Sequence, residues 1–201
     1  MIIRSWRPCD AEAVHRICVA TGDGGDPVHP ILADPNLVAY VFADPYVLLH
    51  PELAFVAEHG GAVLGYVVAA LHTEEFYARW QLEWAPRFAA THPAGRRVNA
   101  RNGDSQLRAF LHRPRLMLPP HLDRYPSHLH INLVSEARRR GTGRKLMHAV
   151  FSQLARAGSP GVQLGVQVGN TRAQAFYHAT GMTRLASNDR AEVRFGLPLN
   201  G

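Results

Sequence analysis

The chain has 201 residues, a length that fits one domain with a substantial core. Its hydrophobic fraction of 46% and charged fraction of 19% are those of an ordinary globular protein and exclude an intrinsically disordered chain. The net charge of +6 favours an anionic partner, such as a nucleotide, a nucleic acid or an acidic surface. A charge that serves solubility alone fits the composition equally well.

Cysteine usage and the N-terminus bear on the compartment. Cys9 and Cys18 are the two cysteines, and their spacing indicates neither a disulfide framework nor a metal site. The first ten residues, MIIRSWRPCD, lack the apolar run of a signal peptide. No stretch approaches the roughly 18 apolar residues of a membrane span. We therefore predict a soluble cytoplasmic protein that does not enter a membrane.

The first half of the chain has the patterns of three strands and two helices. The strands are short apolar runs at residues 2–6, 53–58 and 62–71. A Gly-Gly turn joins the last two as a hairpin. One helix opens at Pro8 and is followed by a loop rich in glycine, aspartate and proline over residues 22–36; the other is predicted to be capped by Thr73.

The second half alternates strands and helices after an irregular segment. Residues 91–127 contain five prolines, so we expect an irregular insertion there with one helix. Strands are predicted at 128–134, 161–168, 182–186 and 191–199, and helices follow the first two of them. A hairpin followed by alternating strands and helices predicts an α/β or α+β fold with a sheet of mixed direction.

A basic turn punctuated by glycines, EARRRGTGRKLM at 136–147, joins the strand at 128–134 to the next helix. The first amides of that helix have no intrahelical partner and lie at the positive end of its dipole. Gly141 and Gly143 let a ligand approach the backbone, and the neighbouring arginines and Lys145 add positive charge. The turn therefore predicts a phosphate or pyrophosphate site, with a solvated basic helix start as the alternative.

Two common phosphate motifs are excluded by spacing. A P-loop would place Lys and then Ser or Thr directly after its second glycine, whereas Gly143 is followed by Arg144, Lys145 and Leu146. The dinucleotide fingerprint would place a third glycine at position 146. The phosphate therefore belongs to another kind of ligand.

Two segments carry a resemblance to a known family. Arg138-x-x-Gly141-x-Gly143 resembles the acyl-CoA pyrophosphate signature, Gln/Arg-x-x-Gly-x-Gly/Ala, of the GCN5-related N-acetyltransferase (GNAT) superfamily. NTRAQAFYHATGM at 170–182 resembles the second signature of that superfamily. A narrower resemblance, carried by YPSHLHINL and DPYVLLHPELAFVAEHGGAVLGYVVAAL, is to the stand-alone bacterial relatives of the acetyltransferase-like C-terminal domain of O-GlcNAcase.

The resemblance implies the GNAT fold over residues 1–201 as a single domain. That fold is a central mixed sheet of about six to seven strands flanked by helices, with a V-shaped splay between the strands at 128–134 and 161–168. It also implies acetyl-CoA as co-substrate and no metal. The residues expected to bind the cofactor are Ile131, Asn132, Leu133, Arg138, Arg139, Arg140, Gly141, Thr142, Gly143, Arg144 and Asn170.

The resemblance also suggests catalytic groups. Tyr177 matches the tyrosine that protonates the leaving CoA thiolate in many members, although a core tyrosine is the alternative. Strand alternation places His128, His130 and Asn132 on one face, where the histidines are candidates for the base or are hydrogen-bonded structural groups. The strand position that supplies a carboxylate base in some acetyltransferases is Gly165 here, which weakens the case for strong base catalysis.

The leading prediction is an acetyl-CoA-dependent N-acetyltransferase that transfers an acetyl group directly to an amine in a ternary complex. The alternative is a pseudo-enzyme that binds acetyl-CoA as a ligand or sensor, because the related O-GlcNAcase domain is thought to be inactive. Nucleic-acid binding is disfavoured, since the arginines gather at one turn rather than along a groove. The acceptor amine stays open, as does the oligomeric state, although dimers are common among the relatives.

Overall fold

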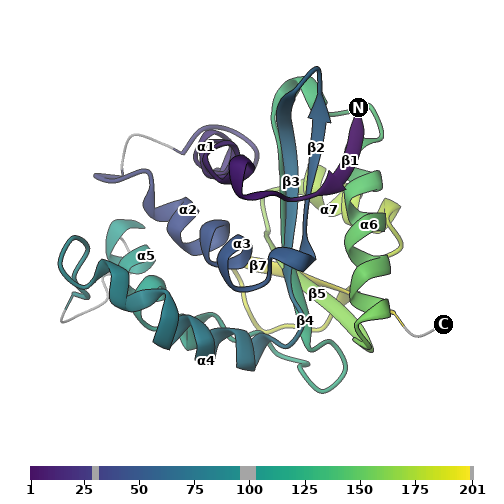
Figure 1. Cartoon of the computed structure of the whole chain (residues 1–201). Coiled ribbons are helices and arrows are strands. Elements are labelled where there is room, and N and C mark those ends of the chain that lie inside the picture. The colour runs from purple at the N-terminus through teal and green to yellow at the C-terminus, as the bar shows by residue number, and fades with distance from the viewer. Residues whose placement is uncertain (29–31, 96–102, 200–201) are drawn as a thin grey trace.

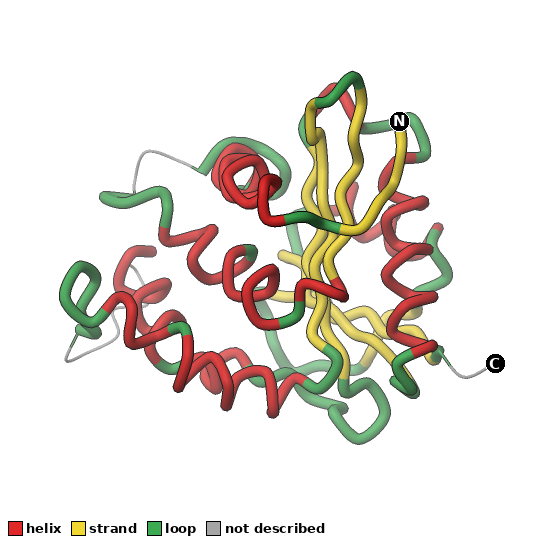
Figure 2. The backbone as a smooth tube through the Cα atoms, in the orientation of Figure 1, coloured by secondary structure: helices red, strands yellow, loops and turns green. Residues whose placement is uncertain are grey.

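The computed structural model describes residues 1–28, 32–95 and 103–199, and its centre is a seven-stranded sheet (Figures 1 and 2). The strands follow the order β1-β2-β3-β4-β5-β7-β6. Their bounds are β1 Ile2–Ser5, β2 Ala54–His59, β3 Ala62–Ala70, β4 Ser127–Leu133, β5 Gly161–Gln167, β6 Thr183–Leu185 and β7 Glu192–Pro198. This mixed sheet flanked by helices is the fold predicted from the sequence.

The sheet opens between β4 and β5, which are its one parallel pair. They pair only at Ser127 with Val162 and at His128 with Gln163. Beyond these residues β4 continues to pair with β3, and β5 continues to pair with β7. The carboxyl-terminal halves of β4 and β5 therefore separate and leave backbone groups on both strands without a strand partner. This is the predicted V-shaped splay.

Helices cover both faces of the sheet (Figure 1). One face carries α1 Ala11–Thr21, α2 Leu37–Phe42, α3 Asp44–Leu49, α4 Thr73–Glu83 and α5 Gly103–His112. The other carries α6 Thr142–Arg156 and α7 Thr171–Ala179. Leu146, Val150 and Leu154 form an apolar stripe on α6, and all three are fully buried. None of the helices in the described ranges is long and apolar enough to cross a membrane.

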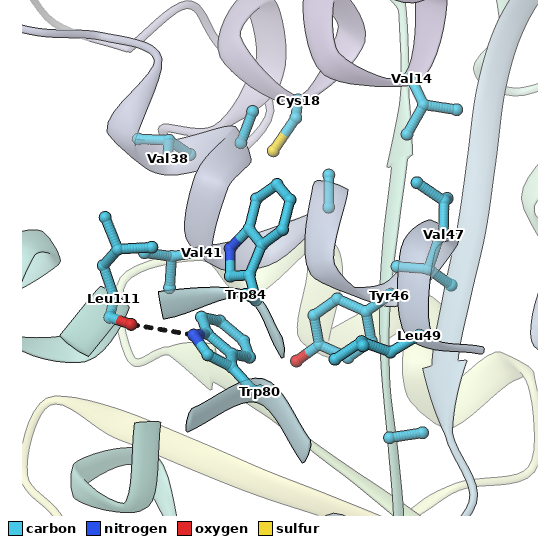
Figure 3. Close-up of a cluster of buried hydrophobic side chains, with 14 of the residues drawn as sticks. Val14, Cys18, Val38, Val41, Tyr46, Val47, Leu49, Trp80, Trp84 and Leu111 are labelled. Atoms are coloured by element: carbon cyan, nitrogen blue, oxygen red, sulfur yellow. Dashed lines mark hydrogen bonds between the residues drawn. The ribbon is translucent and has the colours of Figure 1, made fainter. Parts of the chain in front are cut away.

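The layer formed by α1 to α5 has an aromatic core (Figure 3). Trp80 of α4 is fully buried, and its indole N–H donates a hydrogen bond to the carbonyl of Leu111 at 2.9 Å. Tyr46 of α3 stacks on Phe76 of α4 with ring centroids 4.5 Å apart. These contacts join three helices that the sequence separates and fix the layer against β3 and β4.

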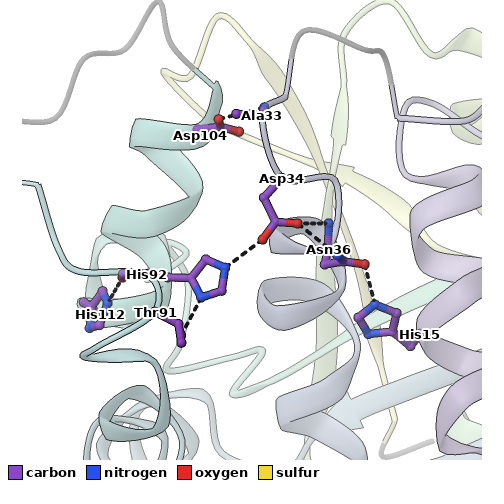
Figure 4. A network of polar contacts seen from close by, with 8 residues as sticks. All are labelled: His15, Ala33, Asp34, Asn36, Thr91, His92, Asp104 and His112. Atoms are coloured by element: carbon purple, nitrogen blue, oxygen red, sulfur yellow. Dashed lines mark hydrogen bonds and ion pairs between the residues drawn. The ribbon is translucent and has the colours of Figure 1, made fainter.

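A chain of polar contacts joins the outer ends of these helices (Figure 4). His15 of α1 contacts Asp44 at 2.8 Å and Asn36 at 3.0 Å. His92 contacts Asp34 at 2.7 Å. The Asp44 carboxylate raises the pKa of His15, so this pair strengthens as the imidazole becomes charged.

The structure differs from the sequence-based prediction in two places. No element was predicted over residues 37–49, where the structure has α2 and α3. Thr73 is the first residue of α4, and His72 stands at the N-cap position instead. The Thr73 hydroxyl donates to the carbonyl of Pro126 at 2.7 Å. In the predicted irregular insertion α5 is the one α-helix described; residues 96–102 of the insertion, and 29–31 of the predicted loop at 22–36, lie outside the described residues.

Candidate active site

The turn between β4 and α6 presents a row of free backbone amides. Arg139 and Gly141 have positive φ angles of 59° and 73°, so the backbone reverses twice within three residues. The backbone amide of Arg138 donates to the carbonyl of Ser135, and that of Lys145 donates to the carbonyl of Gly141. Between them, the amides of residues 139–144 have no acceptor in the described part of the chain. Consecutive unpaired amides at a helix N-terminus form an anion-binding nest.

Gly143 is closely packed in this turn. A Cβ at this position would stand 3.0 Å from the ring of Phe176 in α7. The missing side chain therefore lets the start of α6 pack directly against α7, which brings the two predicted signatures together. Gly141 differs, because a Cβ there would meet nothing within 4 Å, and its need for glycine comes from the backbone angle alone.

A cavity of about 630 Å³ lies beside this turn and reaches into the splay. Ten of the predicted residues line it: Ile131, Asn132, Leu133, Arg138, Arg139, Gly141, Gly143, Arg144, Asn170 and Tyr177. Four predicted residues do not line it: His128, His130, Arg140 and Thr142. The structure thus gathers most of the predicted cofactor residues around one space, with the tyrosine in its wall.

One wall of the cavity was not predicted. It comes from the end of α1 and the loop that follows: Thr21, Gly22, Gly24 and Gly25. Arg138 donates to the carbonyl of Gly25, and Asn170 and Arg172 donate to that of Gly24 at 3.3 and 3.2 Å. The glycine-rich composition indicated a loop, but no local signal indicates that it packs on residues more than 100 positions away. Arg172, Val166, Ala173, Phe176 and Ala179 complete the lining.

Asn170 has a structural role at the cavity edge. Its Oδ1 accepts the amide of Ala173 at 3.0 Å and caps α7, the helix that carries Tyr177. We expect Asn170→Ala to lower the free energy of unfolding by about 1 kcal/mol, because the first turn loses its cap acceptor. Asn170→Asp keeps an acceptor and should retain most of the stability. Urea unfolding of both variants checks this, and equal losses would contradict the capping role.

Tyr177 lies partly buried where α7 meets the splay. Its ring packs against Phe176 and Phe195 with centroids 5.4 and 5.7 Å away. Desolvation raises the pKa of its phenol to about 12. The hydroxyl therefore keeps its proton at neutral pH and is available as a hydrogen-bond and proton donor to an anionic group in the cavity.

His128 and His130 lie on the face of β4 covered by α3 and α4. His128 is 6% exposed, and its ring contacts the hydroxyl of Tyr46 at 2.7 Å and that of Thr73 at 2.8 Å. His130 contacts the same Tyr46 hydroxyl at 3.0 Å. Burial lowers the pKa of His128 far below its ordinary value and that of His130 to about 4, so both rings are neutral at pH 7.

The contacts assign the protons of this pair. The Thr73 hydroxyl donates to the carbonyl of Pro126, so it accepts from Nδ1–H of His128. Nε2 of the neutral His128 then accepts from the Tyr46 hydroxyl, whose oxygen accepts from Nε2–H of His130. This leaves Nδ1 of His130 unprotonated. No hydrogen-bond partner for that nitrogen lies among the described residues. The nitrogen is also not completely enclosed by the protein.

The burial of this pair predicts a loss of stability in mild acid. Below about pH 6.5 histidines of the unfolded chain take up protons, whereas folded His128 and His130 stay neutral down to the lowered pKa values. The free energy of unfolding should therefore fall between pH 6.5 and 4.5, by at most about 1.4 kcal/mol per pH unit for each histidine. Urea unfolding at several pH values measures this slope. His130→Gln should reduce it, and an unchanged slope would contradict the assignment.

The described residues do not form a cluster of metal ligands. Within residues 1–28, 32–95 and 103–199 no three histidine, cysteine, aspartate or glutamate side chains lie close enough together to hold a metal ion. The polar groups that converge on the cavity are amides, guanidinium groups, amide side chains and one phenol. These are hydrogen-bond donors suited to an anion with several oxygen atoms.

The anion nest at the start of α6 lies beside the splay of a mixed sheet, and known proteins share this arrangement. The model of the acetyltransferase (GNAT) family matches residues 118–182, which include the splay and the nest. The crystal structure of SsHAT is 37% identical, covers 100% of this chain and 98% of its own, and superposes with a TM-score of 0.93. The chain belongs to the GNAT acetyltransferase family.

Two more distant structures share the fold. YncA from Salmonella typhimurium, solved with its cofactor acetyl-CoA, is 16% identical, with a TM-score of 0.56 and coverage of 99% of this chain and 94% of its own. Naa20 from Chaetomium thermophilum, solved with a bisubstrate analogue, is 20% identical, with a TM-score of 0.53 and coverage of 98% and 84%. At these identities the likeness concerns the fold alone.

Proposed function

We propose that this chain transfers the acetyl group of acetyl-CoA to an amine by direct attack in a ternary complex. The observation that carries the proposal is the row of unpaired amides at residues 139–144, beside a cavity that continues into the splay and ends near Tyr177. A ligand that fits has an anionic group at one end and an extended arm at the other. Acetyl-CoA has both, as its pyrophosphate and its pantetheine arm.

In the proposed complex the nest holds the pyrophosphate, and one or two of the cavity arginines, Arg138, Arg139 and Arg144, pair with it. The pantetheine arm lies along the free edge of β4. Ile131, Asn132 and Leu133 offer it backbone groups there, because β5 has left that edge. Asn170 contacts the cofactor from α7. Arg140 and Thr142 do not line the cavity, and we propose that they contribute through their backbone amides only.

The chemistry requires a proton to leave the acceptor ammonium and another to reach the departing sulfur. The neutral amine attacks the thioester carbonyl, the carbon–sulfur bond of the tetrahedral intermediate breaks, and CoA leaves as a thiolate. We propose Tyr177 as the acid that protonates this thiolate, since its phenol is protonated at neutral pH and lies in the cavity wall. The products are an N-acetylated amine and free CoA.

His130 is the proposed base, and His128 assists it through Tyr46. Nδ1 of His130 is the unprotonated nitrogen at the end of the hydrogen-bonded series, and Asn132, two residues further along the same face of β4, lines the cavity. The pKa of His130 is about 4, so its ring is a weak base, and the small neutral fraction of the acceptor amine is the species that reacts.

The burial of the histidines also favours a second function. His128 has both ring nitrogens engaged and its pKa lowered, as expected of a structural group rather than a base. An acetyl-CoA-binding module without turnover would need the nest and the cavity but not a base. We therefore keep ligand binding or sensing as the alternative.

A titration separates the cofactor claim from the catalytic claim. Calorimetry with acetyl-CoA and with acetyl-pantetheine, which lacks the pyrophosphate, should show tighter binding of acetyl-CoA if the nest holds that group. Thiol release in the presence of an amine panel then tests transfer. Equal affinity for both ligands would contradict the assignment of the nest. Tight acetyl-CoA binding without thiol release would favour the binding module.

The proposal also covers the subgroup of the family, the number of domains and the cellular compartment. We propose that the chain is a relative of the acetyltransferase-like C-terminal domain of O-GlcNAcase, a relationship supported by the sequence resemblance. We also propose that residues 1–201 act as one domain, because the described strands from both halves share one sheet. The cytoplasm, where acetyl-CoA is made available to such enzymes, is the proposed compartment.

A further inference from the structure

A carboxylate occupies the space above a strand position that has no side chain. A Cβ at Gly165 of β5 would stand 2.4 Å from Oε2 of Glu192 in β7. The strand register pairs Gly165 with Arg194 and Gln167 with Glu192, so the glutamate reaches diagonally across to Gly165. Only glycine at position 165 permits this, because any side chain there would displace the carboxylate.

Glu192 lies on the face of the splay opposite to α6. Leu164 and Val166 of β5 and Val193 of β7 are buried in the core beneath α6, so alternation turns Gly165 and Glu192 to the other face. The cofactor cavity has Val166, Phe176 and Tyr177 on the α6 side and Thr21 with the glycines that follow it on the other side. An acceptor that approaches the thioester through the splay from the face opposite to α6 would meet Glu192.

The surroundings of Glu192 suit a cation. Its side chain is 41% exposed, so the carboxylate is open to a ligand from solvent. Arg194, whose side chain is 15% exposed, donates to the same Oε2 at 3.2 Å and holds it above Gly165. No hydrogen-bond partner of the second oxygen, Oε1, lies among the described residues, so this oxygen can accept from a ligand ammonium. In a chain of net charge +6 a local carboxylate is needed to draw a cationic amine to the splay.

We propose that Glu192 binds the ammonium group of a primary alkylamine acceptor and selects cationic acceptors over neutral ones. It acts as a positioning residue, since it holds the amine near the thioester before the proton is lost. Gly165 is part of the same proposed site, because its lack of a side chain makes room for the Glu192 carboxylate. The inference rests on the proposed transferase function and names the acceptor class for it.

Amine binding to the CoA-loaded protein tests the proposal directly. The probes are putrescine and N-α-acetyl-lysine methyl ester, both cationic, and aniline, which is neutral at pH 7.5. We expect Glu192→Gln to weaken binding of the cationic probes about 10-fold, the loss of a charge-assisted hydrogen bond, without changing CoA affinity. Glu83→Gln is the matched control: Glu83 is also exposed and paired with an arginine, Arg79 at 2.9 Å, but lies on α4. It should change nothing.

A second variant tests the role of the glycine. Gly165→Ala should weaken cationic binding by a similar factor, because its Cβ displaces the Glu192 carboxylate. In a Glu192→Ala background the carboxylate is already gone, so adding Gly165→Ala should have little further effect. Additive losses would mean that Gly165→Ala disturbs the sheet rather than the carboxylate and would contradict the proposed link.

Thiol release in the same samples separates this inference from the transferase proposal. Amine binding that depends on Glu192 without thiol release would retain the cation site and reject the transferase. Thiol release with equal use of cationic amines by wild type and Glu192→Gln would retain the transferase and overturn the role of Glu192. A wild-type protein that binds aniline as well as the cationic probes, or none of the three, would also overturn it.

Discussion

Tyr177→Phe is expected to lower kcat for acetyl transfer by roughly 10²- to 10⁴-fold, the usual contribution of a positioned general acid. The variant loses one oxygen atom from a ring that packs between Phe176 and Phe195, so the packing of α7 should persist. The affinity for acetyl-CoA should stay within about twofold, because only the transition state needs the proton. Steady-state thiol release and calorimetry measure the two quantities separately.

Tyr40→Phe provides the matched control for this substitution. Tyr40 is also a partly buried tyrosine with a raised pKa, but it packs against Phe88 and His92 in the helical layer and does not line the cavity. Its variant should retain full turnover. A Tyr177→Phe enzyme with normal kcat would remove the phenol as the acid and leave protonation of CoA to water.

Gly141→Ala should weaken acetyl-CoA binding roughly 5- to 150-fold. An alanine at φ 73° is strained by about 1–3 kcal/mol, and the loop relieves that strain by rotating its amides away from the pyrophosphate. A Cβ at this position meets nothing within 4 Å, so steric overlap is not the cause. Isothermal titration with acetyl-CoA measures the change directly.

Gly158→Ala separates the effect on binding from the general cost of a strained alanine. Gly158 follows α6 with φ 86°, and a Cβ there also meets nothing within 4 Å. Both variants should therefore lose similar stability in urea, but only Gly141→Ala should lose affinity for acetyl-CoA. Equal affinity losses would indicate that the nest has no special part in binding.

The features that the sequence predicted well are those with local signals. Gly141 and Gly143 mark a turn through backbone angle and close packing, and the basic residues around them mark its charge. The strand at 128–134 alternates clearly enough for the sequence alone to assign its two faces. Because each of these signals lies within about ten residues, neither the turn nor its position before α6 depends on distant contacts.

The features that the sequence did not predict depend on distant pairing. α2 and α3 have six residues each and are interrupted at Ala43, so neither shows enough helical periodicity to be recognised. Gly24 is held at the cavity because its carbonyl accepts hydrogen bonds from Asn170 and Arg172, which lie about 150 positions away in the sequence. Glu192 lies over Gly165 only because β5 pairs with β7 in this register. The burial of His128 follows from Tyr46 on α3, an element absent from the sequence-based prediction.

The central claim is that the chain moves an acetyl group from acetyl-CoA to an amine. The most direct test is a single-turnover experiment in which the protein, preloaded with acetyl-CoA carrying a labelled acetyl group, is mixed with excess cationic primary amine. We expect free CoA thiol and labelled N-acetylated amine to appear together in equal amounts. We also expect Tyr177→Phe to slow the appearance of both products equally. Acetyl-CoA that stays bound and intact with every amine, in a protein that binds it tightly, would contradict the claim.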